Sequence, residues 1–220
     1  MSIKIALVGA PSCGKSTCAA DVFVNCKKKG IKVELIQEFA REQINKGWTI
    51  NSIAEQFIIN LNQRRKEDII PKTIDVWITD SPAFLTYFYA LWHMTINDSN
   101  FILSELYKQF LEDLERYDQI YFMNRVKDYV MDGTREQTEI ESDLISNQLK
   151  VLLDMHHVYY TELPGDDGAV QYIMNYIDKE MHPENKIRIE RIKNTFKESA
   201  STTVPFSKPF EIIHFGPYND

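Results

Sequence analysis

The sequence has few cysteines, and their number limits the kind of protein that it encodes. The 220 residues include three cysteines, Cys13, Cys18 and Cys26. Three thiols cannot all pair within one chain, and a chain of this length can build a hydrophobic core without disulfides. We therefore favour a reducing, cytoplasmic setting.

Long apolar runs and an excess of positive charge are also missing. No stretch approaches the roughly 18–20 apolar residues of a membrane-spanning helix, and the apolar start at residues 3–8 is too short for a signal peptide. We therefore expect no membrane partner. Lys and Arg number 25 against 32 Asp and Glu, which gives a net charge of −7. This balance argues against bulk duplex DNA as the default partner, because DNA favours a basic protein surface.

What is present is an alternation of predicted strands and helices. Apolar runs at 3–8, 31–36, 74–79, 119–123 and 158–162 predict strands, and helical patterns occur at 15–29, 51–70, 83–93, 101–116, 139–156, 168–179 and 183–199. Such alternation implies right-handed βαβ crossovers and a central parallel sheet of about five strands. We expect one domain over residues 1–182, followed by a helix and tail over 183–220. That tail is a candidate for a surface strap or for a contact in a homo-oligomer.

The residues between the first strand and the first helix match the pattern G-x-x-x-x-G-K-[ST] without deviation. They are Gly9, Ala10, Pro11, Ser12, Cys13, Gly14, Lys15, Ser16 and Thr17. Glycines let backbone N–H groups turn toward a polyphosphate, and the helix amino terminus adds its dipole. The lysine would contact the β- and γ-phosphates, and the serine hydroxyl would bind Mg²⁺. Together with the alternating elements, this motif predicts a three-layer α/β P-loop NTPase fold with a nucleoside triphosphate site.

Acidic residues follow two other predicted strands. Asp80 ends the strand at 74–79 and lies at the sheet edge where doubly wound folds bind ligands. Its carboxylate is a candidate for holding Mg²⁺ or for accepting the proton of a substrate hydroxyl; capping the next helix is the simpler alternative. Glu38 follows the second strand with Arg41 one turn later, a pair suited to a hydroxyl and an anion. The sequence does not decide which acid is the base.

A polar loop follows the fourth predicted strand, over about residues 125–138. Phosphoryl transfer concentrates negative charge on the γ-phosphate, and kinases bring mobile arginines over it. We therefore predict a lid in which Arg125 and Arg135 stabilise the transferring group, Asp132 lies near the substrate and Gly133 acts as a hinge. An ordinary charged loop is the alternative.

Taken together, these residues resemble the ribosylnicotinamide kinase domain of bacterial NAD regulators, a group of P-loop kinases with phage relatives. The resemblance covers about residues 3–180 and rests on the 9–17 loop, Glu-Phe-Ala-Arg at 38–41, Asp80 and Asp-Gly-x-Arg at 132–135. It implies ATP- and Mg²⁺-dependent phosphorylation of a hydroxyl on a nucleoside, nucleotide or ribosylnicotinamide. It also implies that Lys15, Ser16 and Thr17 contact phosphate and metal, with Asp80 at the metal or the acceptor and Arg135 in the lid.

Two other functions share this fold. Phage relatives of the group include kinases that act on hydroxymethylated pyrimidines in DNA, and such an enzyme needs a basic strip beside its acceptor cleft. Residues 64–66 and 186–193 are candidates for that strip, although a solvated helix face is the simpler interpretation. The other alternative is a nucleotide-dependent switch that hydrolyses ATP without an acceptor.

Overall fold

A computed structural model of the chain describes residues 2–94, 100–129 and 137–181. The strands are β1 (Ile3–Val8), β2 (Val33–Ile36), β3 (Val76–Thr79), β4 (Gln119–Asn124) and β5 (Thr161–Pro164). The helices are α1 (Lys15–Lys28), α2 (Phe39–Ile44), α3 (Ile53–Asp68), α4 (Leu85–His93), α5 (Asn100–Leu114), α6 (Glu139–Met155) and α7 (Asp167–Met181). Residues 130–136 of the predicted lid and the whole 183–220 segment lie outside the described residues, so the expectations for them stay predictions.

The strands form one parallel sheet in the order β2-β3-β1-β4-β5. The central strand β1 pairs with β3, where Ala6 lies opposite Thr79, and with β4, where Val8 lies opposite Phe122. Because β1 and β3 are neighbours, the loop after β1 and Asp80 after β3 leave the sheet side by side. Helices cover both faces, which confirms the predicted three-layer α/β fold.

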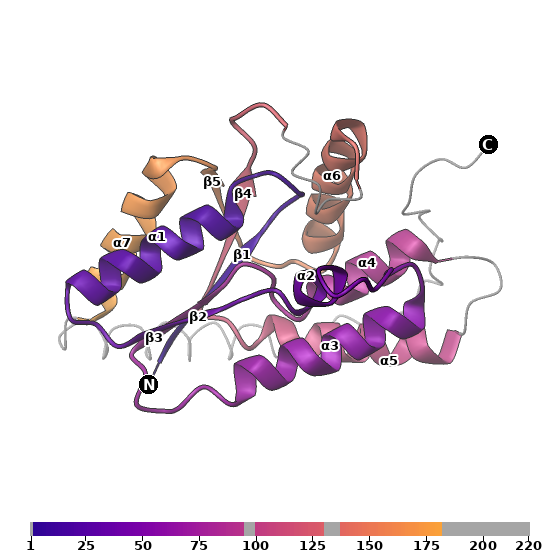
Figure 1. Cartoon of the computed structure of the whole chain (residues 1–220), viewed down its shortest axis with the longest axis horizontal. Coiled ribbons are helices and arrows are strands. Elements are labelled where there is room, and N and C mark those ends of the chain that lie inside the picture. Colours follow the sequence, from indigo (N-terminus) through magenta and orange to yellow (C-terminus); the bar gives the residue numbers. More distant parts are fainter. Residues whose placement is uncertain (1, 95–99, 130–136, 182–220) are drawn as a thin grey trace.

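Alternate side chains of β1 enter two separate cores. Ile5 and Leu7 pack in a cluster with the inner sides of α1 and α7, which lie side by side (Figure 1). Ala6 and Val8 belong to the opposite cluster, which contains the inner side chains of α3, α4, α5 and α6. Burial on both faces explains why this strand is a nearly continuous apolar run.

Two elements differ from the prediction by more than two residues at an end. The strand expected at 158–162 begins at Thr161, because Val158 donates its N–H to the Leu153 carbonyl and the φ of His157 is 52°, so these residues close the end of α6. Helix α2 was not predicted at all, since six residues are too few to show a helical period. In the described ranges, no helix is long and apolar enough to cross a membrane.

Candidate active site

The loop between β1 and α1 adopts a backbone that requires glycine at two positions. Gly9 has a φ of 139° and Gly14 a φ of 88°. A Cβ atom on Gly9 would lie 2.6 Å from the Met123 carbonyl oxygen, and one on Gly14 would lie 3.1 Å from that of Gly165. The loop therefore wraps closely at the amino terminus of α1, where unpaired N–H groups and the helix dipole favour an anion.

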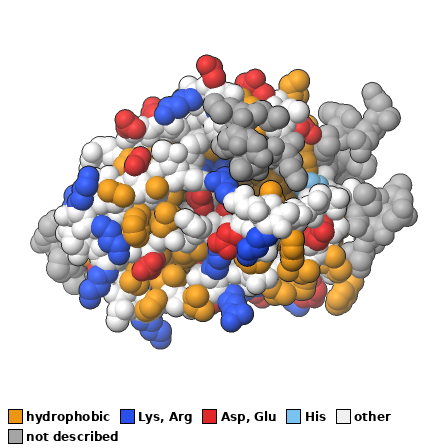
Figure 2. Space-filling model, viewed as in Figure 1, with side chains coloured by type: hydrophobic (Ala, Val, Ile, Leu, Met, Phe, Trp, Pro, Cys, Tyr) orange, Lys and Arg blue, Asp and Glu red, His pale blue; other side chains and the backbone are white. Residues whose placement is uncertain are grey.

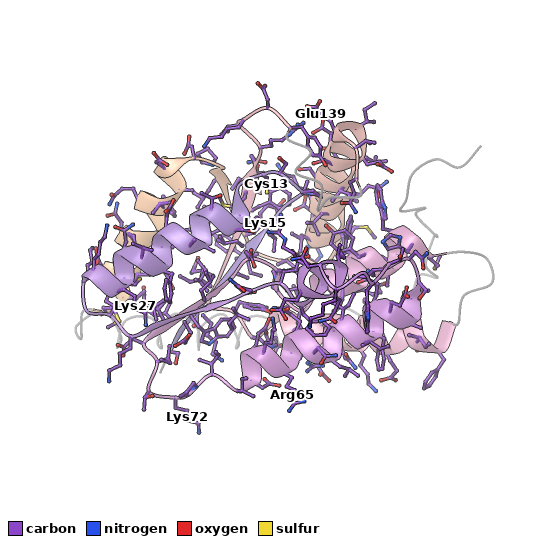
Figure 3. The ribbon with its side chains drawn as sticks, in the orientation of Figure 1. Cys13, Lys15, Lys27, Arg65, Lys72 and Glu139 are labelled. Atoms are coloured by element: carbon purple, nitrogen blue, oxygen red, sulfur yellow. The ribbon has the colours of Figure 1, made fainter. Side chains whose placement is uncertain are left out.

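Lys15 places its ammonium group against this loop. Its Nζ donates hydrogen bonds to the carbonyl oxygens of Gly9 and Ala10, both at 2.8 Å, and lies 3.6 Å from Cys13 Sγ. Figure 3 shows Lys15 and Cys13 together at the start of α1, with Lys27 at the far end of the helix. The structure thus brings a positive charge to the end of the helix that attracts anions.

A cavity of about 370 Å³ joins this loop to the predicted acidic residues. Residues that line it include Lys15, Ser16, Glu38, Arg41 and Asp80. Figure 2 shows acidic and basic side chains gathered in a hollow near the centre of the molecule. Of the predicted 9–17 loop, every residue except Ala10 lines the cavity; Ala10 is buried and contributes its carbonyl to Lys15. Three separate chain segments, predicted one at a time, therefore meet in one place.

Asp80 is a buried carboxylate with an incomplete set of partners. The side chain is 7% exposed, and within the described residues its Oδ1 has no hydrogen-bond partner. An unpaired buried carboxylate oxygen is costly, so a ligand that binds it would relieve that cost. The described residues contain no group of three His, Cys, Asp or Glu that would hold a metal without help. One carboxylate, the Ser16 hydroxyl and phosphate oxygens are together a donor set that fits Mg²⁺.

Glu38 and Arg41 form an ion pair at the amino-terminal end of α2. Arg41 Nε lies 3.6 Å from Glu38 Oε2, and Arg41 Nη1 donates a hydrogen bond to Ser16 Oγ at 3.4 Å. The Glu38 side chain is 30% exposed, and its partial burial raises the pKa of the carboxyl; the Arg41 guanidinium opposes that shift, and the carboxylate of Asp80 adds to it. A carboxylate with a raised pKa is a stronger proton acceptor near neutral pH.

The far wall of the cavity consists of residues that the sequence analysis did not select. They are Ile44, Ile50, Gln56, Ile59, Leu85, Thr86, Tyr89 and His93, from α2, α3, α4 and the segment between α2 and α3. A mainly apolar wall with a few polar groups is typical of a small-molecule site. The aromatic stretch of α4 is the sequence feature that points to this wall. Helical spacing alone, however, does not show which ring faces a cavity.

The side chain of Arg125 forms its contacts outside this cavity. Its Nη1 and Nη2 donate to Glu139 Oε1 at 2.6 Å and Asp143 Oδ1 at 2.5 Å, both on α6, and its guanidinium lies 5.6 Å from the ring centre of Tyr129. Of the described residues of the predicted lid, Gln137 lines the cavity and Arg125 does not. Asp132 and Arg135 lie outside the described residues. The roles of all three lid residues remain predictions.

A second cavity, of about 230 Å³, lies on the other side of the phosphate loop. Its walls include the loop residues Ser12 to Gly14, the segment Val126 to Asp128 after β4 and the segment Gly165 to Asp167 after β5. Gly165 connects these segments, because its N–H donates to the Asn124 carbonyl at 2.8 Å. The two cavities thus share the phosphate loop as a common wall.

The basic strip predicted at residues 64–66 is largely neutralised. Arg64 lies 3.0 Å from Glu112 and 3.1 Å from Asp113, and Lys66 pairs with Glu42. Arg65 lies with Lys72 at the outer edge of the molecule, away from Lys15 (Figure 3). The other candidate strip, at 186–193, lies outside the described residues.

The fold and the loop geometry define a P-loop protein of the three-layer α/β type. A family model described as an AAA domain matches residues 4–170, so the chain belongs to this AAA-domain family. No curated protein gives a sequence match to the chain.

Solved structures of NadR are similar to this chain. The crystal structure of NadR in complex with NR has a TM-score of 0.62 at 17% identity, and covers 80% of this chain and 52% of that one. The structure of NadR with NAD and AMP-PNP has a TM-score of 0.57 at 15% identity, and the match covers 82% of this chain and 51% of the NadR chain. The chain therefore spans about half the length of these structures. They confirm at the level of fold the resemblance to the ribosylnicotinamide kinase group.

Proposed function

We propose that this chain is an ATP-dependent phosphotransferase that moves the γ-phosphate to a hydroxyl of a nucleoside-like small molecule. The observation that carries the proposal is that Lys15, Glu38 and Asp80 line one cavity. A phosphate loop alone also suits a switch, but a carboxylate of raised pKa beside it offers a place for an acceptor hydroxyl. The similarity to NadR structures solved with NR, NAD and AMP-PNP supports a nucleoside, nucleotide or ribosylnicotinamide acceptor and an ATP donor.

Donor and acceptor would occupy the two cavities that share the phosphate loop. The 9–17 loop and Lys15 would bind the triphosphate, and the second cavity would take the nucleoside end of ATP. Ser16 and Asp80 would hold Mg²⁺, which when bound neutralises charge on the phosphate oxygens. The acceptor would lie against the mainly apolar wall, with its hydroxyl toward Glu38 and Asp80.

The transfer itself exchanges one phosphorus–oxygen bond for another. The acceptor oxygen bonds to the γ-phosphorus while the bond from that phosphorus to the bridging oxygen breaks, and ADP leaves. Glu38 takes the hydroxyl proton, because burial raises its pKa. Asp80, whose buried Oδ1 has no hydrogen-bond partner in the described part of the chain, suits the metal. Lys15 stabilises the charge on the phosphates, so catalysis is mainly positioning and electrostatic stabilisation.

Transfer of label from γ-labelled ATP to a panel of acceptors tests this function. The panel contains ribosylnicotinamide, nucleosides, nucleoside monophosphates and DNA with hydroxymethyluracil. We expect label on one small acceptor, and a loss on the order of 1,000-fold in a Lys15→Ala variant, because a major charge at the phosphates is removed.

Other outcomes of the same assay would replace the proposal. Label on the DNA alone would establish the DNA kinase alternative. Label only in free phosphate, at a rate that no acceptor changes, would establish the switch. Retention of full transfer by the Lys15→Ala variant would remove the phosphate loop from the reaction.

A further inference from the structure

One buried side chain, Gln63 of α3, contacts both segments that carry the acidic residues of the cavity. It is 2% exposed. Its Oε1 accepts a hydrogen bond of 2.9 Å from the backbone N–H of Phe39, the residue directly after Glu38. Its Nε2 donates a long hydrogen bond of 3.5 Å to Oγ1 of Thr79, the residue directly before Asp80. The two strand ends are thus connected through a single amide.

The partners determine the orientation of this amide. A backbone N–H can only donate, so it must face the amide oxygen, and the amino group then faces the Thr79 hydroxyl. Thr79 Oγ1 also accepts a hydrogen bond from the N–H of Ser81 at 3.2 Å. The hydroxyl therefore connects the residues before and after Asp80, and Gln63 joins this local arrangement to the start of α2.

Neighbouring residues of α3 reach one segment each. Lys66 Nζ donates to the Gln37 carbonyl at 3.1 Å, and Glu67 Oε1 accepts from the Ala83 N–H at 3.2 Å. Gln63 differs because it reaches both the Glu38 segment and the Asp80 segment. Its removal would leave each segment attached to α3 and would remove the side chain that contacts both of them.

We propose that Gln63 is a positioning residue that sets the separation of the Glu38 and Asp80 carboxylates. This inference rests on the proposed phosphotransferase function. Phosphoryl transfer needs the proton acceptor and the metal ligand in fixed relative positions, and displacements on the order of 1 Å reduce rates strongly. The phosphate loop has no part in the contact, so ATP binding should depend little on Gln63.

The first test compares two Gln→Met substitutions of the same size. Gln63→Met keeps most of the side-chain volume and removes both hydrogen bonds. Gln109→Met on α5 is the matched control, because Gln109 Oε1 is buried without a hydrogen-bond partner among the described residues. We expect kcat of the Gln63 variant to fall about tenfold with KM for ATP changed less than twofold, and no change of either constant in the control. A fall in kcat of the same size in both variants would overturn the proposal.

A double-mutant cycle tests the route through Thr79. Thr79→Val removes the hydroxyl while keeping the shape of a buried residue. If Gln63 acts on Asp80 through that hydroxyl, the fold-loss in kcat of the double variant will be smaller than the product of the fold-losses in Gln63→Met and Thr79→Val. Losses that multiply fully would show that the two residues act independently and would overturn this route.

Amide hydrogen exchange tests the same contact without any reliance on activity. Gln63→Met should speed exchange in peptides covering residues 37–44 and 79–86, whereas Thr79→Val should affect only the second. Unchanged exchange in both peptides of the Gln63 variant would overturn the inference. If the wild-type protein transferred no phosphate while the exchange pattern appeared as expected, the proposed function would fail and the structural role of Gln63 would stand.

Discussion

The two faces of the sheet bury different kinds of residue. The buried side chains of α1 and α7 are cysteine, alanine, valine, isoleucine and methionine. In the described part of the chain, the buried polar and charged side chains all belong to α2–α6 or to the end of β3. They are Gln43, Gln56, Asn60, Gln63, Glu67, Thr79, Asp80, Thr86, Asp113 and Ser142. One face is therefore an apolar core, and the other combines an apolar core with a polar network.

This difference separates two ways of building a site. On the α1 and α7 side, the phosphate loop presents backbone groups and a helix amino terminus, which need little more than a close-packed support. On the other side, Glu38 and Asp80 must be held by side chains, and each buried polar group needs a partner. The side that carries the predicted acceptor chemistry is thus the costlier one to fold.

Glu67 shows how that cost is limited. Its carboxylate accepts hydrogen bonds from Tyr117 Oη at 2.8 Å and Arg116 Nε at 3.1 Å. Burial nevertheless raises the pKa of Glu67 to about 7, and burial raises the pKa of neighbouring Asp113 to about 6. The network therefore depends on pH near neutrality, whereas on the apolar face burial raises the pKa values of the thiols Cys18 and Cys26 to about 12 and about 11.

The largest expected effect separates the two carboxylates of the polar side. Glu38→Gln should lower kcat by about 100-fold to 10,000-fold, because it removes the proton acceptor. It should also remove the fall in activity at acidic pH. In the wild type this fall should begin at a higher pH than an ordinary glutamate would give, because the pKa of Glu38 is raised. Asp80→Asn should instead raise the Mg²⁺ concentration needed for half-maximal rate. Profiles of rate against pH and Mg²⁺ for both variants distinguish these roles, and an exchange of the two signatures would reverse the assignment.

The next effect is a loss of stability as pH rises. The folded-state pKa of Glu67 is raised from 4.5 to about 7, so folding favours its protonated form. Its contribution is complete below about pH 4.5 and is lost as pH rises through about 7, with a size on the order of 3 kcal/mol. The free energy of unfolding in urea should differ less between pH 5 and pH 8 in the Glu67→Gln variant than in the wild type. Equal differences would mean that this carboxyl does not drive the pH dependence.

On the phosphate-loop side, a methyl group should be enough to disturb the site. A Cβ atom on Gly165 would lie 2.2 Å from the Cys13 carbonyl oxygen, so Gly165→Ala must displace the loop and should raise KM for ATP about tenfold. Gly30→Ala is the control, because its φ of +75° strains an alanine but no atom of the described residues lies within 4 Å of the new Cβ. We expect that variant to lose about 1 kcal/mol of stability with KM unchanged. Equal KM changes would attribute the effect to general destabilisation.

The smallest expected effect concerns how the helices of the two sides begin. Helix α1 follows Gly14 and has no side-chain cap, whereas at α3 the Ser52 hydroxyl accepts a hydrogen bond from the Glu55 N–H. Ser52→Ala should therefore cost about 1 kcal/mol in thermal or urea unfolding. The kcat of this variant should stay unchanged, and a large fall in kcat would mean that the start of α3 also shapes the cavity.

Local patterns were sufficient to predict the phosphate-loop side. The motif from Gly9 to Thr17 lies between a buried strand and a helix, and its residue types and spacing can be recognised without knowing its distant contacts with Met123 and Gly165. Glu38 and Asp80 were also found from sequence, because parallel strands place their carboxyl ends at one edge of the sheet. The prediction of β5 failed at its start, since the turn that ends α6 uses Val158.

The partners of those residues could not be predicted in the same way. Arg125 follows β4 as expected, yet its guanidinium pairs with Glu139 and Asp143, which a sequence does not show to be close. Gln63 lies 24 residues from Phe39 and 16 from Thr79 along the chain, and only the packing of α3 brings the three together.

The sequence by itself therefore determined the fold class, the phosphate loop and the strand ends that carry acidic residues. These features follow from hydrophobic periodicity, from the conformations open to glycine and from the geometry of parallel sheets. Only the tertiary structure decided that Glu38, Asp80 and Lys15 share one cavity with Tyr89, and that Gln63 connects two of their segments. Such contacts depend on how α2, α3 and α4 pack on the sheet, and no short stretch of sequence contains that information.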